Sequence, residues 1–205
     1  MQAKRRQEDK RNSLKRMILR EAKEIAASEG WQNVTIRKIC DKIHYTAPVI
    51  YQHFENKEMI LCAIRIEAMT SMYEIFEEID KKYEKPDKRL LKYGLAWWHF
   101  AQTNPELYQV MFNLQGALCI DIGTDKPTYN TVIDFYKSAF SELNRDAKKS
   151  EKLMIEFCDN IIAIIHGFIS LQMVGKIRSG KEHAEDTFKN ALKRFIHSIK
   201  ISKQP

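Results

Sequence analysis

Hydrophobic residues recur every three or four positions along most of the chain, which is the spacing of an amphipathic α-helix. The first such stripe consists of Leu14, Ile18, Ala22 and Ile25. Gly30 follows it where a C-terminal helix cap is expected. The preceding residues, 1–12, are polar, and we expect them to be frayed. No stretch alternates with the period of two that a strand requires. The pattern predicts an all-α protein.

Two short helices are predicted after Gly30. Thr35 and Thr46 have side chains that commonly cap helix N-termini, and each precedes a short apolar segment. Pro48 would lie in the first turn of the second short helix, where its missing N–H removes no helical hydrogen bond. Asn56 then caps a longer helix that begins at Lys57. This order of long and short helices is typical of a helix-turn-helix DNA-binding domain.

The remainder of the chain predicts further helices, with breaks at three places. Pro86 restarts a helix after a charged loop, Asn104–Pro105 ends the next, and Arg178–Gly180 separates the last two. Residues 113–126 read as a long loop. We therefore expect two domains, a three-helix domain over residues 1–58 and a larger helical domain over residues 59–205.

Positive charge is concentrated in the first domain. The 205 residues carry a net charge of +7. Residues 1–57 hold 13 Lys and Arg against 7 Asp and Glu, which gives +6 and leaves +1 for the rest of the chain. A basic head on a nearly neutral body suggests a polyanionic partner, although a solvated N-terminal arm explains the charge equally well.

Composition argues against several other classes of protein. No apolar run approaches the roughly 18 residues of a membrane span, and the N-terminus lacks a secretory signal, so we expect a cytoplasmic protein with no membrane partner. The cysteines show no zinc-site spacing, and we expect no metal and no cofactor. We expect all of them to be buried free thiols, with Cys119 as the alternative candidate for a redox sensor; they are Cys40, Cys62, Cys119 and Cys158.

The segment from Gly30 to Ile60, GWQNVTIRKICDKIHYTAPVIYQHFENKEMI, resembles the DNA-binding signature of the TetR family of transcriptional repressors. The resemblance is strongest over Ile50–Phe54 and Asn56–Ile60. His44 stands where the family usually has glycine, and a positive φ there would strain it. The resemblance implies a homodimer that binds a palindromic double-stranded operator and is released by a small-molecule effector. Residues 59–205 would then be the ligand-binding and dimerisation domain.

The expected DNA contacts follow from side-chain chemistry. They are Thr35, Arg37, Thr46, Ala47, Pro48, Val49, Tyr51, His53 and Lys57. The threonines, Tyr51, His53 and Lys57 suit phosphates, Arg37 suits a base edge or the backbone, and the three apolar residues suit thymine methyls. Alternatively, the threonines are plain helix caps, Tyr51 packs against the first helix, and His53 has no phosphate contact.

Aromatic residues are frequent in the second domain, which favours an apolar or aromatic effector. The candidate effector residues are Trp97, Trp98, His99, Phe100, Phe112, His166 and Phe168. Ordinary core packing is the alternative for the aromatic residues and for both histidines. We expect the long fourth helix to couple this cluster to the DNA-binding head.

The last two helices carry wide apolar stripes, which we interpret as a four-helix interface between two copies. The candidate interface residues are Ile165, Ile169, Phe188, Leu192 and Phe195.

Two other classes of function compete with a repressor. One is a helical scaffold that binds nucleic acid without sequence preference. The other is an all-helical enzyme that uses His99 or His166. We expect no enzyme, because no nucleophile–base set, glycine-rich phosphate loop or carboxylate pair is evident.

Overall fold

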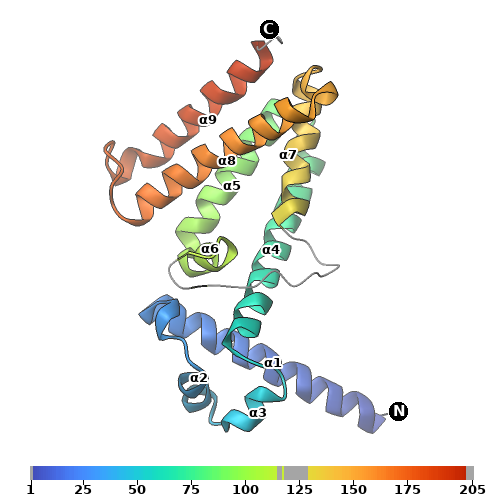
Figure 1. The fold of residues 1–205 in the computed structure, drawn as a ribbon, viewed down its shortest axis with the longest axis vertical. Coiled ribbons are helices and arrows are strands. Elements are labelled where there is room, and N and C mark those ends of the chain that lie inside the picture. The colour runs from blue at the N-terminus through green and yellow to red at the C-terminus, as the bar shows by residue number, and fades with distance from the viewer. Residues whose placement is uncertain (1, 115–116, 118–128, 202–205) are drawn as a thin grey trace. The chain divides into compact units, whose positions relative to one another are not determined.

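The computed structural model describes residues 2–114, 117 and 129–201. These residues form helices and connecting turns, with no strand among them (Figure 1). The all-α prediction is therefore confirmed. The chain divides into an N-terminal unit, Met1–Ala68 with Asn104–Lys126, and a C-terminal unit, Met69–Thr103 with Pro127–Pro205.

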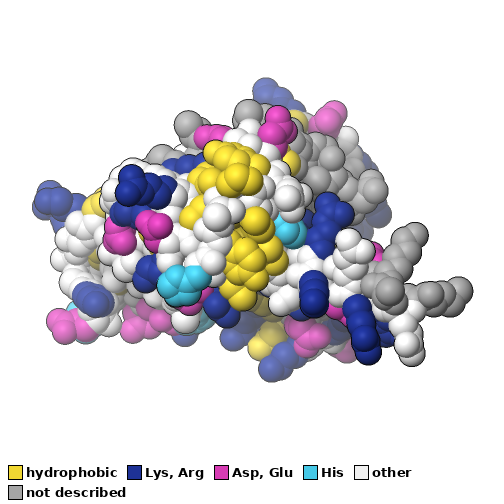
Figure 2. All heavy atoms as spheres, turned by 90° about the horizontal axis from the view of Figure 1, so that it is seen from below, with side chains coloured by type: hydrophobic (Ala, Val, Ile, Leu, Met, Phe, Trp, Pro, Cys, Tyr) yellow, Lys and Arg dark blue, Asp and Glu magenta, His cyan; other side chains and the backbone are white. Residues whose placement is uncertain are grey.

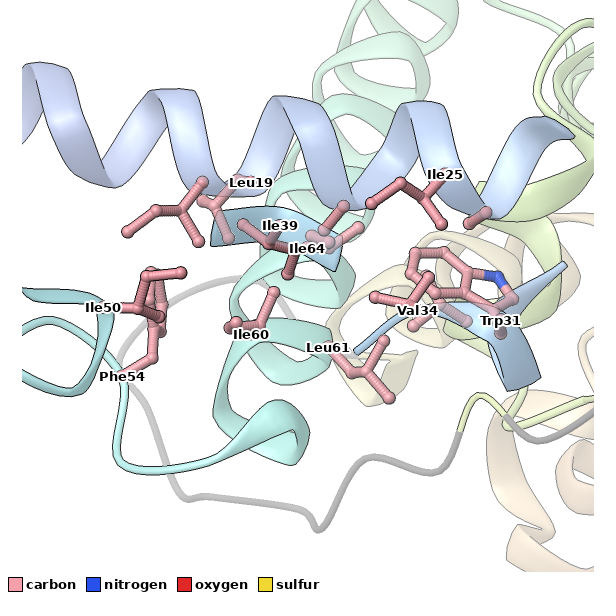
Figure 3. Packing of buried hydrophobic residues seen from close by; sticks show 14 of the residues in the cluster. Leu19, Ile25, Trp31, Val34, Ile39, Ile50, Phe54, Ile60, Leu61 and Ile64 are labelled. Carbon is pink, nitrogen blue, oxygen red and sulfur yellow. The ribbon is translucent and has the colours of Figure 1, made fainter. Parts of the chain in front are cut away.

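The N-terminal unit is built around a helix-turn-helix. Its elements are α1 (Gln2–Glu29), the 3₁₀ turn η1 (Trp31–Asn33), α2 (Ile36–Ile43), α3 (Ala47–Tyr51), the first part of α4 (Lys57–Lys82) and α6 (Pro105–Met111). One hydrophobic core joins them. In Figure 3, Leu19 and Ile25 of α1 lie above Ile39 of α2, Ile50 of α3 and Ile60 of α4.

Helix α1 is longer than the sequence pattern predicts. It begins at Gln2, so the expectation of a frayed segment over residues 1–12 is wrong from Gln2 onward. Residues 2–12 contain no Gly or Pro and are rich in Lys, Arg, Gln and Glu, which have good helix propensity. The predicted end is confirmed, since Gly30 has a φ of 84° and its N–H donates to the carbonyl of Ala26.

The unit boundary differs from the predicted division after residue 58. The structure divides the chain inside α4, and α6 belongs to the N-terminal unit. Val110 of α6 is fully buried in that unit's core, and the Trp31 indole donates to the carbonyl of Glu106 at 2.8 Å. Linear hydrophobic patterns do not reveal such contacts between distant segments.

The C-terminal unit has an aromatic core. It comprises the rest of α4, α5 (Pro86–Thr103), α7 (Tyr129–Leu143), the 3₁₀ turns η2 (Ala147–Lys149) and η3 (Lys181–His183), α8 (Glu151–Met173) and α9 (Ala184–Ile201). Phe76 stacks on Tyr93 at 4.4 Å and meets Trp97 edge-on at 6.2 Å. Helices α5 and α9 pack closely at Gly94, where an added Cβ would lie 2.4 Å from Leu192 Cδ1.

The cysteines only partly match the expectation of free thiols. Cys40 and Cys158 are buried free thiols as predicted. Cys62 is disulfide-bonded, which corrects the prediction for that residue. Cys119 lies outside the described residues. Within the described part of the chain, no group of three His, Cys, Asp or Glu side chains is placed to hold a metal ion.

Helix α8 is long and apolar enough to cross a membrane by length and composition alone, although only 33% of its most apolar stretch is buried. Its buried side is nevertheless part of the folded unit. Phe157, Ile161, Ile165 and Ile169 pack inward, as expected of a core helix. What remains is an apolar helix with an unusually exposed outer side.

Candidate nucleic-acid interface

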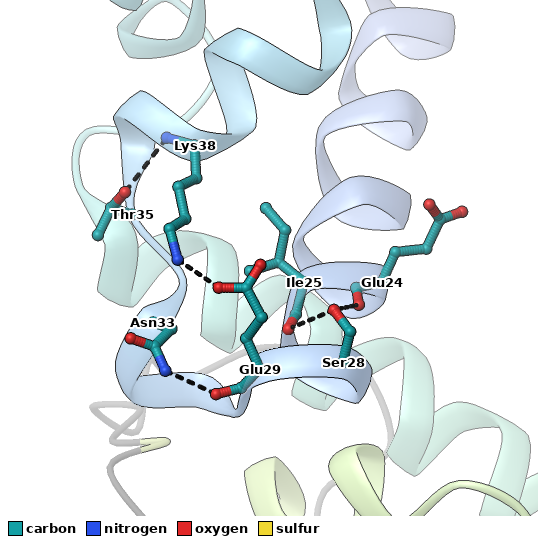
Figure 4. A network of polar contacts seen from close by, with 7 residues as sticks. All are labelled: Glu24, Ile25, Ser28, Glu29, Asn33, Thr35 and Lys38. Carbon is teal, nitrogen blue, oxygen red and sulfur yellow. Dashed lines mark hydrogen bonds and ion pairs between the residues drawn. The ribbon is translucent and has the colours of Figure 1, made fainter.

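Helix α2 has the predicted N-cap and ends in a left-handed residue. The Thr35 hydroxyl accepts a hydrogen bond from the Lys38 backbone N–H at 3.2 Å (Figure 4). His44 ends α2 in the left-handed region, with φ 58° and ψ 41°, and its N–H donates to the carbonyl of Cys40. The predicted strain is therefore present, at a cost of about 1 kcal/mol for a residue that is not glycine.

The end of α1 is fastened to the start of α2. In Figure 4 the Glu29 carboxylate accepts a hydrogen bond from Lys38 Nζ, and the Glu29 carbonyl accepts one from Asn33 Nδ2 at 2.7 Å. Ser28 Oγ donates to the Glu24 carbonyl at 2.9 Å. The two contacts of Glu29 join the end of α1 to η1 and α2.

Helix α3 has one buried and one exposed side. Ile50 is fully buried, and Phe54 just after the helix is 5% exposed, as predicted for core residues. Tyr51 is 53% exposed, so it does not pack into the core with them. Thr46 has extended N-cap geometry, but its hydroxyl makes no capping hydrogen bond. Pro48 lies in the first turn, as predicted.

The outer side of α3 is largely apolar, and polar side chains lie at its two ends. Figure 2 views the molecule from below, the side on which α2 and α3 lie in Figure 1, and hydrophobic side chains gather near its centre with Lys and Arg side chains beside them. Thr46 and Pro48 are exposed, and Ala47 and Val49 are partly buried. These positions are compatible with the predicted contacts to base edges and phosphates.

Sequence reasoning missed Tyr45, which is 45% exposed and immediately precedes the N-cap of α3. Its place in the turn next to Thr46 was the available signal. A phenol at this position has a hydroxyl that can donate to a phosphate oxygen.

His53 and Lys57 are less available than predicted. Burial lowers the pKa of the His53 imidazole, and the positive charges of Arg11 and Lys15 lower it further. His53 is thus a neutral hydrogen-bonding group at neutral pH. Lys57 Nζ donates to the Trp31 carbonyl at 2.8 Å, and burial lowers its pKa. Lys57 fastens the start of α4 to η1, and its phosphate contact stays a prediction. Arg37 is exposed.

The candidate effector residues belong to both units, and two of them, Trp98 and Phe168, meet at Phe188. Trp97 lies in the aromatic core, Trp98 stacks on Phe188 at 5.0 Å, and His99 is exposed near Glu185. Phe100 is buried in α5, and Phe168 meets Phe188 at 5.5 Å. Phe112 stands 4.8 Å from Tyr108 in the N-terminal unit. His166 is partly buried, and burial lowers its pKa to about 4.

Two cavities in the C-terminal unit are lined by other residues. One, of about 250 Å³, lies beside Tyr73 and Phe135. The other, of about 270 Å³, lies between α5 and α9 and carries Lys88, Lys193 and Lys200. The predicted effector site therefore stays a prediction.

Four of the five candidate interface residues are buried within their own unit. Ile165, Ile169, Phe188 and Leu192 are each at most 1% exposed, because the apolar stripes of α8 and α9 cover α5 and one another. Phe195 is partly exposed. The predicted dimer thus requires other residues for direct contact with a partner.

Comparison with known proteins identifies both parts of the chain. Residues 18–64 match the family model of bacterial regulatory proteins, tetR family, and residues 90–195 match that of the tetracyclin repressor-like C-terminal domain. The helix-turn-helix described above falls within the first match.

Two relatives are named as uncharacterized HTH-type transcriptional regulators. Rv0681 of Mycobacterium tuberculosis is 22% identical over 72% of this chain, and the aligned region spans 64% of that relative's length. YobS of Bacillus subtilis is 24% identical over 76% of this chain and 77% of its own length.

Solved structures share the fold. A TetR variant from Acinetobacter baumannii, in complex with minocycline, has a TM-score of 0.61 and 17% identity, covering 88% of this chain and 93% of its own. A Rhodococcus protein of unknown function has a TM-score of 0.64 and 15% identity, covering 90% of this chain and 94% of its own. With the family models matched over most of its length, the chain belongs to the TetR family of bacterial transcriptional regulators.

Proposed function

We propose that the chain is a cytoplasmic, dimeric repressor that places α3 of each copy in a major groove of a palindromic operator. The observation that carries this proposal is the two-sided character of α3, with Ile50 buried and Tyr51 53% exposed. A helix of 5 residues buries too little surface to stand alone. Packing of its buried side therefore holds the exposed side chains in a fixed orientation, which the recognition of base edges requires.

The exposed groups suit duplex DNA. The hydroxyls of Tyr45, Thr46 and Tyr51 can donate to phosphate oxygens, which sets the position of the helix on the duplex. Pro48 and Val49 offer apolar contact to thymine methyl groups in the groove. Arg37 on α2 is an exposed cation for a phosphate or a guanine edge.

Removing either tyrosine hydroxyl is expected to weaken operator binding. Tyr45→Phe and Tyr51→Phe each keep the ring but delete one phosphate donor. A lost hydrogen bond to a charged group costs about 1.5 kcal/mol and each dimer loses two of them, so we expect roughly hundredfold weaker binding with no change in the unfolding midpoint. Fluorescence anisotropy with a duplex selected by the wild-type chain measures this effect.

Tyr83→Phe is the matched control, because it removes a hydroxyl from the C-terminal unit and should leave affinity unchanged. Unchanged affinity of both Tyr45→Phe and Tyr51→Phe would exclude these hydroxyls from the interface. Equal affinity of the wild-type chain for a scrambled duplex would favour the scaffold that binds nucleic acid without sequence preference.

The outer side of α8 is our proposed dimer interface. Ala163, Gly167 and Leu171 are exposed at spacings of four residues, which places them on one side of the helix, and the C-cap residue Val174 is exposed directly after it. Leu171 and Val174 are 48% and 57% exposed. A Cβ added at Gly167 would contact nothing within 4 Å, so two helices can approach closely there. The buried Ile165 and Ile169 would support this surface from beneath.

A small apolar or aromatic effector is our proposal for the C-terminal unit. Phe168 and His166 of α8 are partly buried, and the lowered pKa of His166 keeps its ring neutral at neutral pH, which suits an uncharged ligand. Helix α4 contributes residues to both units, so a change in α4 is an economical means of coupling. An effector is expected to alter the fluorescence of Trp97 or Trp98 and to raise the operator Kd. A ligand that changes fluorescence alone would contradict the coupling.

A further inference from the structure

We propose that the first half of α1 is a second DNA-contacting element, which binds the phosphates that flank the site read by α3. The partner is the sugar-phosphate backbone of the same duplex. This inference rests on the proposed function, but it concerns residues outside the helix-turn-helix.

The positive charge of residues 1–57 lies almost wholly in this segment. Residues 1–16 contain seven Lys and Arg against two Asp and Glu, a net charge of +5. Residues 17–57, which include α2 and α3, contain six against five, a net charge of +1. The helix-turn-helix by itself is therefore nearly neutral, and the non-specific attraction to DNA must come mainly from the segment before it.

Of the six cations in residues 17–57, three are held in ion pairs. Arg20 pairs with Glu21 at 2.8 Å, Lys23 pairs with Glu67 at 3.2 Å, and Lys38 pairs with Glu29. In contrast, the cations of the first half of α1 are exposed and make no ion pair within the described residues; they are Arg5, Arg6, Lys10, Arg11 and Arg16. They are available to neutralise phosphates and thereby to release the counterions condensed on the DNA.

Two cations of this segment, Arg11 and Lys15, lie on the side of α1 that faces α3. Arg11, Lys15, Ile18, Ala22 and Ile25 follow one another at spacings of four, three, four and three residues, so these two cations continue the buried stripe of α1. Lys15 Nζ lies 5.5 Å from the centre of the Phe54 ring, directly after α3. The field of Arg11 and Lys15 also reaches His53. In Figure 1, α1 continues past α3 toward the N-terminus.

The length of the segment suits several phosphates. Residues 2–13 span ~18 Å along the helix axis, over which duplex DNA carries about ten phosphate charges. This part of α1 is exposed and gains little stability from tertiary packing. Its cationic side chains therefore have no evident structural role within the unit. Contact with the duplex backbone gives them one.

The test replaces four of these cations together, as Arg5→Gln, Arg6→Gln, Lys10→Gln and Arg11→Gln. Glutamine has similar helix propensity, so α1 should persist, and circular dichroism checks this. We measure Kd at several salt concentrations for the duplex selected by the wild-type chain and for a scrambled duplex of equal length. The slope of log K against log salt should become shallower by about 0.9 for each phosphate that the variant no longer neutralises. Both duplexes should bind about a hundredfold more weakly at low salt, with the ratio of their affinities unchanged.

The control makes the same charge change in the C-terminal unit, at exposed cations outside the proposed interface, as Arg145→Gln, Lys148→Gln, Lys149→Gln and Lys152→Gln. It should leave the slope unchanged. An equal loss of affinity in the control, an unchanged slope in the α1 variant, or an altered preference at flanking base pairs would each overturn this inference. If the wild-type chain binds neither duplex, the proposed function fails as well, which separates the two outcomes.

Discussion

Replacing Trp31 by alanine is expected to unfold the N-terminal unit and to abolish DNA binding. Trp31 is fully buried, and Figure 3 shows its ring beside Val34, with Leu61 of α4 nearby. Its indole N–H donates to the Glu106 carbonyl at 2.8 Å, and its own carbonyl accepts from Lys57 Nζ. The residue therefore joins η1, α4 and α6, and the alanine variant loses the ring packing and the indole hydrogen bond but keeps the carbonyl contact. Truncating a buried Trp costs about 3–5 kcal/mol, a large share of the stability of a small unit.

Urea unfolding followed by circular dichroism measures this loss. Trp31→Phe is the control, because it keeps most of the ring volume and removes the N–H donor, at a cost of roughly 1–2 kcal/mol. A loss below about 1 kcal/mol for Trp31→Ala would show that the unit tolerates the cavity. It would also remove the structural reason for grouping α6 with the helix-turn-helix.

The variant Leu171→Arg is expected to be monomeric and to bind the operator at least a hundredfold more weakly. Leu171 is 48% exposed, so the substitution should change protomer stability little. In a symmetric interface the new charge is buried twice without a partner, which costs several kcal/mol. A monomer also loses the simultaneous grip on two half-sites.

Ile155→Arg is the matched control on the same helix. Ile155 is 50% exposed, and a separation of 16 residues places it about 160° around α8 from Leu171. Light scattering should show a dimer for Ile155→Arg and a monomer for Leu171→Arg. A dimeric Leu171→Arg would place the interface on another surface.

Local signals in the sequence predicted most of the helix boundaries. Thr35, Asn56 and Gly30 act through their nearest backbone neighbours, and the structure confirms all three, with Asn56 Oδ1 accepting from the Met59 N–H at 2.9 Å. The break at Asn104–Pro105 is confirmed for the same reason, since proline restricts the residue before it.

Features that depend on distant contacts were not predictable in this way. The apolar stripes on α8 and α9 are wide because each of these helices packs against α5 and against the other. Ile165 and Phe188 therefore looked like interface residues in the sequence, although they belong to the core. Lys57 was expected to face DNA, but a carbonyl 26 positions earlier in the chain engages it. The helix over residues 2–12 was missed because it has no apolar stripe.

The sequence that the wild-type chain selects from a pool of random duplexes tests the central claim most directly. A dimer that presents two copies of α3 should enrich an inverted repeat, with half-site centres about 10–10.5 base pairs apart or a multiple of that spacing. Two protomers should bind each selected duplex. Recovery of no common sequence, or of a single unrepeated site bound by one protomer, would contradict the account.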